Sequence, residues 1–145
     1  MIDHLEISVS NLPASTVFYT AALAPLGYRH YVAREALCGW GTTEIAPDFW
    51  VRTSGPSQPG GPLLPGGLSQ ATPAATPLPH VAFNCVSRDL VRRCYEAAVA
   101  TGARSRVEPT LMTQVHANYF AAQVFDPDGH NIEFACHAAD SERER

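Results

Sequence analysis

Residues 2–10, IDHLEISVS, and residues 79–87, PHVAFNCVS, decide the fold of this chain. In the first stretch apolar side chains alternate with polar ones, and the apolar face holds Leu5, Ile7 and Val9. An alternation of period two predicts a half-buried β-strand. The second stretch alternates in the same way, so it predicts a second strand of the same kind.

Each of these strands is followed by the pattern of a helix. Ser10 or Asn11 can cap the first helix, which has a proline in its first turn and apolar residues at helical spacing as far as Leu23. Ser87 can cap the second helix, which Gly102 ends. The order of strand and then helix therefore occurs twice.

The second copy lies 76 residues after the first, an offset that aligns His4 with His80 and Tyr19 with Tyr95. Such alignment indicates an internal duplication. Three strand-like segments follow each helix: 28–32, 37–41 and 48–53 in the first half, then 105–108, 118–125 and 131–137 in the second. Residues 126–129, DPDG, have the composition of a tight turn and predict a hairpin between the last two strands. The expected fold class is α+β, with two βαβββ modules at residues 1–53 and 78–137.

The segment between the modules has a different composition. Residues 54–77 are rich in Gly, Pro and Ser and contain no charged residue. This composition is typical of a linker or of a loop lying over a binding site, and we favour the linker. Residues 138–145 predict a charged tail.

Composition excludes several classes of partner. The net charge is -4, and the ten positive charges are all arginines with no basic run, which argues against nucleic acid. No apolar run is long enough for a signal peptide or a membrane span, so the expected location is the cytoplasm. The four cysteines form no CxxC pair, and we expect buried free thiols rather than disulfides or a zinc site.

The polar faces of the predicted strands carry the candidate chemistry. These faces hold His4 and Glu6, then Asp48, Trp50 and Arg52, then His80 and Asn84, then Asn131, Glu133 and His137. An antiparallel sheet can simply expose such a face to water. If the sheet curls so that the faces converge, two imidazoles and one carboxylate suit iron(II), and also zinc, manganese or nickel.

Three stretches resemble hallmark segments of the vicinal oxygen chelate superfamily, which contains glyoxalase I, bleomycin-resistance proteins and extradiol dioxygenases. They are residues 3–23, residues 79–87 and residues 125–134, FDPDGHNIEF. The resemblance implies that the two modules form a cup-shaped, eight-stranded mixed sheet with flanking helices. It also implies a small-molecule substrate or ligand and a homodimer.

The same resemblance implies a set of metal ligands. Metal-using members carry them on the first and last strands of each module, and His4, His80 and Glu133 match three of these positions. Trp50 stands about where the fourth ligand, a glutamate, would be, although Asp48 lies two residues earlier. This departure fits either a three-ligand divalent metal site or a site without metal.

Residues 116–137 also resemble a group of glyoxalase-like bacterial and fungal proteins, which share a histidine, a tyrosine and a terminal Cys-His, here His116, Tyr119 and His137. One hypothesis is a metal-dependent enzyme of lyase, isomerase or dioxygenase type. Its candidates for proton transfer are Glu6, His116 and His137. A second hypothesis is a metal-free protein that sequesters a planar molecule, with Asp48, Phe49, Trp50 and Tyr119 around the ligand. A third is a structural homodimer with degenerate pockets.

Overall fold

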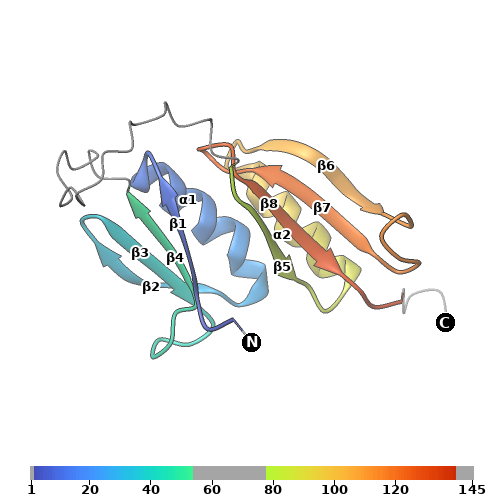
Figure 1. The fold of residues 1–145 in the computed structure, drawn as a ribbon, viewed down its shortest axis with the longest axis horizontal. Coiled ribbons are helices and arrows are strands. Elements are labelled where there is room, and N and C mark those ends of the chain that lie inside the picture. The colour runs from blue at the N-terminus through green and yellow to red at the C-terminus, as the bar shows by residue number, and fades with distance from the viewer. Residues whose placement is uncertain (1, 54–77, 140–145) are drawn as a thin grey trace, which may run out of the picture.

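The strand and helix patterns appear twice in the computed structural model, which describes residues 2–53 and 78–139. The first module consists of β1 (Leu5–Val9), α1 (Leu12–Leu23), the short 3-10 helix η1 (Ala24–Leu26), β2 (Arg29–Arg34), β3 (Leu37–Gly41) and β4 (Phe49–Thr53). The second consists of β5 (His80–Asn84), α2 (Arg88–Ala100), β6 (Arg104–Leu111), β7 (Phe120–Phe125) and β8 (Asn131–Cys136). The two βαβββ modules and the α+β class are confirmed (Figure 1).

The helix caps explain where α1 and α2 begin. The Asn11 side chain accepts a hydrogen bond from the backbone N–H of Ala14 at 3.0 Å, which makes it the cap of α1. Ser10, the other candidate, instead donates its backbone N–H to Asp128 at 2.9 Å. The Ser87 hydroxyl accepts from the backbone N–H of Leu90 at 3.2 Å, as predicted for α2.

The eight strands form two mixed sheets of four. Their orders are β1-β4-β3-β2 and β5-β8-β7-β6, so the second sheet repeats the order of the first. In each sheet the first and last strands of the module pair in parallel and the other pairs are antiparallel. Both helices lie on the same side of the sheets, and the β1 edge of one sheet faces the β5 edge of the other (Figure 1).

The two modules share one hydrophobic core. Helices α1 and α2 pack against each other, and the rings of Phe49 and Phe83 meet edge to face at 5.4 Å. The cysteines Cys38, Cys85, Cys94 and Cys136 are all buried and free, as predicted. None of the helices in the described ranges is long and apolar enough to cross a membrane.

The predicted strand boundaries needed correction around the β6–β7 connection. Strand β6 is longer than predicted, and β7 starts two residues later because residues 112–119 form a turn. This turn is closed by hydrogen bonds from Met112 N–H to Tyr119 O at 2.7 Å and from Tyr119 N–H to His116 O at 3.0 Å. The predicted linker at 54–77, and all of the charged tail except residues 138 and 139, lie outside the described residues.

Candidate functional site

Strand β8 carries a buried carboxylate on the sheet face that points away from the helices. Ile132 and Phe134 belong to the core, whereas Glu133 alternates to the other face and is nevertheless only 4% exposed. Its neighbours across the sheet are Ala82 on β5 and Gln123 on β7. A carboxylate buried at this level must be paired or hydrogen-bonded to be tolerated.

Two side chains supply those hydrogen bonds. His80 Nε2 lies 2.7 Å from Glu133 Oε2, and the Tyr119 hydroxyl donates to Glu133 Oε1 at 2.8 Å. Since an ionised carboxylate only accepts, His80 Nε2 is the donor in its pair. Burial, followed by the bond to Glu133, raises the pKa of Tyr119 to about 12, so its phenol keeps the proton that it donates. Both oxygens of Glu133 are therefore engaged by the protein itself.

A pair of histidines adjoins Tyr119. His116 Nε2 and His137 Nδ1 lie 2.9 Å apart, and the backbone N–H of Asn118 donates to His116 Nδ1 at 3.1 Å. Because a backbone N–H can only donate, a neutral His116 carries its proton on Nε2 and gives it to His137. The Tyr119 ring packs edge to face on both imidazoles, with centroids 5.4 and 5.0 Å away. We call these five side chains the polar cluster: His80, His116, Tyr119, Glu133 and His137.

The matching face of the first sheet pairs its charges differently. His4 Nδ1 lies 2.7 Å from the exposed carboxylate of Asp3. Arg52 donates twice to Glu6, at 2.9 and 3.1 Å, and this bond lowers the pKa of the Glu6 carboxyl. The structure therefore groups His80 with Glu133, whereas His4 bonds to the adjacent Asp3 and Glu6 bonds to Arg52 of β4.

Trp50 forms an aromatic wall on this first-sheet face. Its indole N–H donates to Pro47 O at 2.9 Å, and its ring lies against Gly39 of β3, where an added Cβ would come within 2.7 Å of the ring. Glycine at this position therefore allows the ring to lie on the strand. A cavity of about 480 Å³ opens beside it, with His4, Glu6 and Ile45 also in its lining.

The other two candidate ligand-binding residues of the first module have different surroundings. Phe49 is buried in the core against Tyr19 and Phe83, so it supports the sheet from the helix side. Asp48 accepts a hydrogen bond from the Tyr28 hydroxyl at 3.1 Å and does not line the cavity beside Trp50.

The expected metal ligands can be tested against this arrangement. Within residues 2–53 and 78–139, no three His, Cys, Asp or Glu side chains come together as a metal site. His4 is paired with Asp3, and the indole of Trp50 is a donor without a lone pair for a metal. Of the three expected ligands, only His80 and Glu133 come together in this arrangement, so the described residues do not form the expected three-ligand site.

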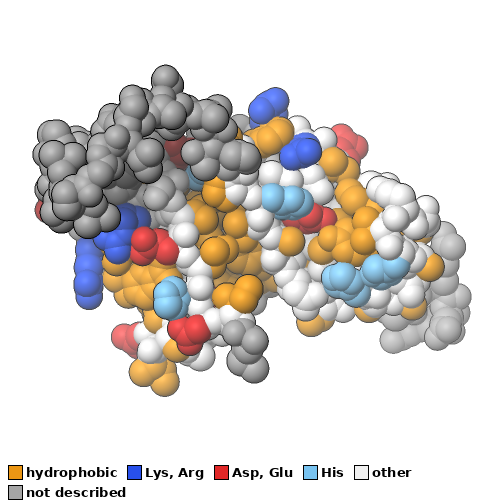
Figure 2. Space-filling model, in the orientation of Figure 1, with side chains coloured by type: hydrophobic (Ala, Val, Ile, Leu, Met, Phe, Trp, Pro, Cys, Tyr) orange, Lys and Arg blue, Asp and Glu red, His pale blue; other side chains and the backbone are white. Residues whose placement is uncertain are grey.

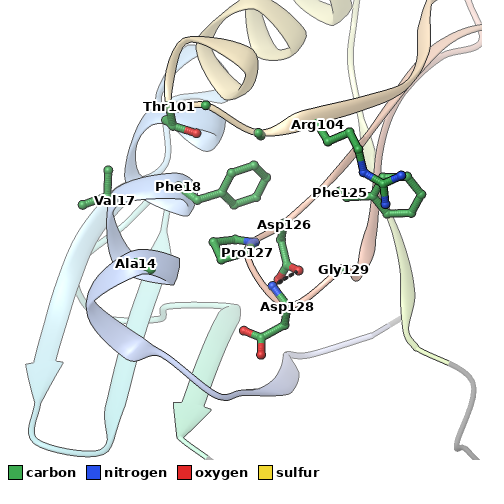
Figure 3. Close-up of a pocket in the computed structure, with 12 residues that line it drawn as sticks. Ala14, Val17, Phe18, Thr101, Arg104, Phe125, Asp126, Pro127, Asp128 and Gly129 are labelled. Atoms are coloured by element: carbon green, nitrogen blue, oxygen red, sulfur yellow. Dashed lines mark hydrogen bonds between the residues drawn. The ribbon is translucent and has the colours of Figure 1, made fainter.

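A larger cavity, of about 660 Å³, lies on the helix side of the molecule, between α1, the turn after α2 and the β7–β8 hairpin (Figure 3). Phe18 and Pro127 line it, and Asp126 is its buried carboxylate. That carboxylate is occupied, because it accepts hydrogen bonds from Tyr19 and His130 and from backbone N–H groups of the hairpin. The Asp126 network is buried, whereas His80 and His137 of the polar cluster are exposed to solvent, so the polar cluster is the better candidate site.

Sequence reasoning missed the arginines at the start of β6. Arg104 and Arg106 lie over the ring of Phe125, with guanidinium carbons 4.1 and 5.7 Å from its centroid. The predicted strand began after Arg104, and the two charges looked scattered. Their position over the ring follows from the pairing of β6 with β7, which sets Arg104 opposite Phe125.

The fold and the site together indicate a class of protein: one built from two βαβββ modules, with a polar site on the sheet face opposite its helices. The model of the Glyoxalase/Bleomycin resistance protein/Dioxygenase superfamily matches residues 1–134, and the chain belongs to this superfamily. No curated protein matches the chain.

Solved structures of the superfamily have the same fold. A glyoxalase/bleomycin resistance protein from Albidiferax ferrireducens is similar at 22% identity over 92% of this chain and 96% of that one, with a TM-score of 0.66. A putative glyoxalase from Bacillus halodurans is similar at 21% identity over 94% and 95%, with a TM-score of 0.62. A lactoylglutathione lyase from Agrobacterium tumefaciens is similar at 13% identity over 94% and 92%, with a TM-score of 0.63. At these identities the likeness shows the fold alone.

Proposed function

We propose that this protein binds a small organic molecule over the polar cluster of its second sheet and needs no resident metal to hold that site together. The observation that carries the proposal is the complete hydrogen bonding of Glu133 by His80 and Tyr119. A buried carboxylate without such partners would require a cation. Here the protein supplies both donors, so the site is preorganised before any ligand arrives.

The chemistry of the exposed groups supports a ligand that forms hydrogen bonds. With Nε2 of His80 donating to Glu133, Nδ1 remains for a ligand, and the His80 side chain is 51% exposed. His137 accepts from His116 through Nδ1, which leaves Nε2–H as a donor. The rings of Tyr119 and the two histidines add flat apolar surface beside these polar groups.

The proposal predicts that small aromatic probes bind over the cluster. Titration with benzoate, benzyl alcohol and benzylammonium should shift the backbone amide resonances of Tyr119, Glu133 and His137 for at least one probe. Val99, exposed on the outer face of α2, serves as the reference that should not move. Tyr119→Ala should weaken binding about fivefold, which corresponds to the loss of one aromatic contact. If no probe shifts the cluster more than Val99, the proposal fails.

A metal-dependent enzyme is the second candidate, and one distance favours it. His80 Nε2 and Glu133 Oε2 lie 2.7 Å apart, close enough for one divalent ion to take both atoms in place of the shared proton. His4 would have to leave Asp3 to join them. Such an ion would supply Lewis-acid chemistry for a lyase, isomerase or dioxygenase reaction. Glu6, His116 and His137 remain its candidates for proton transfer.

Metal content separates the two candidates. After dialysis against zinc, nickel, manganese and anaerobic iron(II), we expect much less than one ion per chain, measured by elemental analysis of tag-free protein. One ion per chain that is lost in His80→Ala and Glu133→Ala but kept in His137→Ala would establish the metal site and remove the metal-free proposal.

A further inference from the structure

Four side chains form one row across the second sheet. Arg104 on β6 pairs with Phe125 on β7, Phe125 pairs with Asn131 on β8, and Asn131 pairs with His80 on β5. Directly paired residues project from the same face of a sheet. The row therefore follows the face of the polar cluster, and His80 belongs to both. At the other end of the row, where β6 begins and β7 ends, Arg104 and Phe125 also border the cavity on the helix side.

The first end of the row is cationic. The guanidinium groups of Arg104 and Arg106 lie over the same Phe125 ring. Within the described ranges neither arginine forms an ion pair with a carboxylate. Two like charges on one ring repel each other, and the ring leaves the edges of the guanidinium groups free to donate. An oxyanion is the group that neutralises such a pair, because it accepts charge-assisted hydrogen bonds from both arginines.

The middle of the row contains an acceptor that lacks a donor. Asn131 is only 6% exposed, and its Nδ2 donates to Gln123 Oε1 at 3.2 Å. Its Oδ1 is buried and has no hydrogen-bond partner. A buried acceptor left in this state destabilises the protein until a donor reaches it. A hydroxyl or N–H of a ligand lying along the row would supply that donor.

The other module provides a natural comparison. Strand β2, which occupies the place of β6 in the first sheet, begins at Arg29, but the residue paired with Arg29 is Gly41. Arg29 therefore has no aromatic ring beneath it at that position. The ring, the second arginine and the unpartnered amide oxygen come together at the row in the second sheet. In Figure 2, arginine, histidine and acidic side chains lie near one another on this face of the second module.

We infer that this row is an oxyanion subsite of the ligand site proposed above, and the inference rests on that proposed function. The ligand carries a carboxylate or phosphate group at Arg104 and Arg106, a hydrogen-bond donor at Asn131, and its remaining body towards His80 and Glu133. The substrate class is thus a small organic anion with a hydroxyl or N–H group.

Matched probes with the same ring test the inference. Dissociation constants for benzoate, phenyl phosphate, benzyl alcohol and benzylammonium are measured by titration of amide resonances in the full chain. Both anions should bind at least about fivefold more tightly than benzyl alcohol, and benzylammonium should bind most weakly. The tighter of the two anions identifies the preferred oxyanion. Arg104→Gln should raise the dissociation constant for benzoate about tenfold, whereas Arg29→Gln should change that constant by less than about twofold.

Three results would overturn the inference: benzyl alcohol binding as tightly as both anions, benzylammonium binding more tightly than either, or Arg29→Gln weakening benzoate as much as Arg104→Gln. Each of them leaves the proposed function standing, because a probe still binds over the cluster. If none of the four probes shifts Tyr119 or Glu133, the inference and the proposed function fail together. Both arginines are exposed, and equal thermal unfolding midpoints would verify that the variants are folded.

Discussion

Replacing Asp126 by alanine is expected to lower the free energy of unfolding by about 3–5 kcal/mol, the cost of breaking a buried charged network by removing one partner. The Asp126 carboxylate accepts hydrogen bonds from Tyr19 at 2.7 Å, from His130 Nδ1 at 2.8 Å and from the backbone N–H groups of Asp128 and His130. Tyr19 belongs to α1 of the first module and Asp126 to the β7–β8 hairpin of the second. The substitution therefore removes both the hairpin turn's internal acceptor and a tie between the modules.

Urea denaturation followed by circular dichroism measures this effect. Tyr19→Phe is the matched control, because it deletes one hydroxyl and should cost only about 1–2 kcal/mol. Burial and the neighbouring Asp126 raise the pKa of Tyr19, so the hydroxyl stays protonated and donating in the native protein. A wild-type denaturation midpoint in Asp126→Ala would show that the hairpin does not hold the modules together.

The two tryptophans should respond very differently to truncation. Trp40→Ala is expected to cost about 3–5 kcal/mol, since the side chain is 0% exposed and a large cavity would remain. Trp40 packs against Tyr19, Phe49 and His30 and donates its indole N–H to Thr20 at 3.1 Å. Trp50 lies on the surface of the same sheet, half-buried over Gly39, so Trp50→Ala should cost about 1 kcal/mol or less.

The same denaturation experiment compares both variants. Trp50→Ala should keep the native fold by circular dichroism while losing the fluorescence of the more exposed indole. A loss of stability in Trp50→Ala equal to that in Trp40→Ala would mean that Trp50 is part of the core, and it would no longer serve as a candidate ligand-binding wall.

Much of the fold could be predicted because its signals are local. Alternation in residues 2–10 and 79–87 marked β1 and β5, and Asn11 and Ser87 marked the starts of the helices. Turn chemistry at residues 126–129 marked the β7–β8 hairpin. The boundaries of β6 and β7 were less accurate, because the turn that separates them is closed by backbone hydrogen bonds that leave little trace in the sequence.

The candidate site was only partly predictable. The polar faces of β5 and β8 were evident from alternation, and His80 and Glu133 do come together. The hydrogen bonds that decide the properties of the site were not evident. They depend on side chains from three segments, namely β5, the 112–119 turn and β8 with the residue after it, and their directions follow from packing rather than from spacing.

The sequence by itself determined the duplication, the order of strands and helices, and the buried state of the cysteines, because each of these follows from the periodicity of apolar residues along a short segment. Only the tertiary structure decided which partners the charged groups take. His4 and His80 are equivalent in the duplication, yet His4 meets an exposed Asp3 and His80 meets a buried Glu133. The physical reason is that hydrogen bonds are short and directional, so the partner of each histidine is set by strand register and by the neighbouring loop.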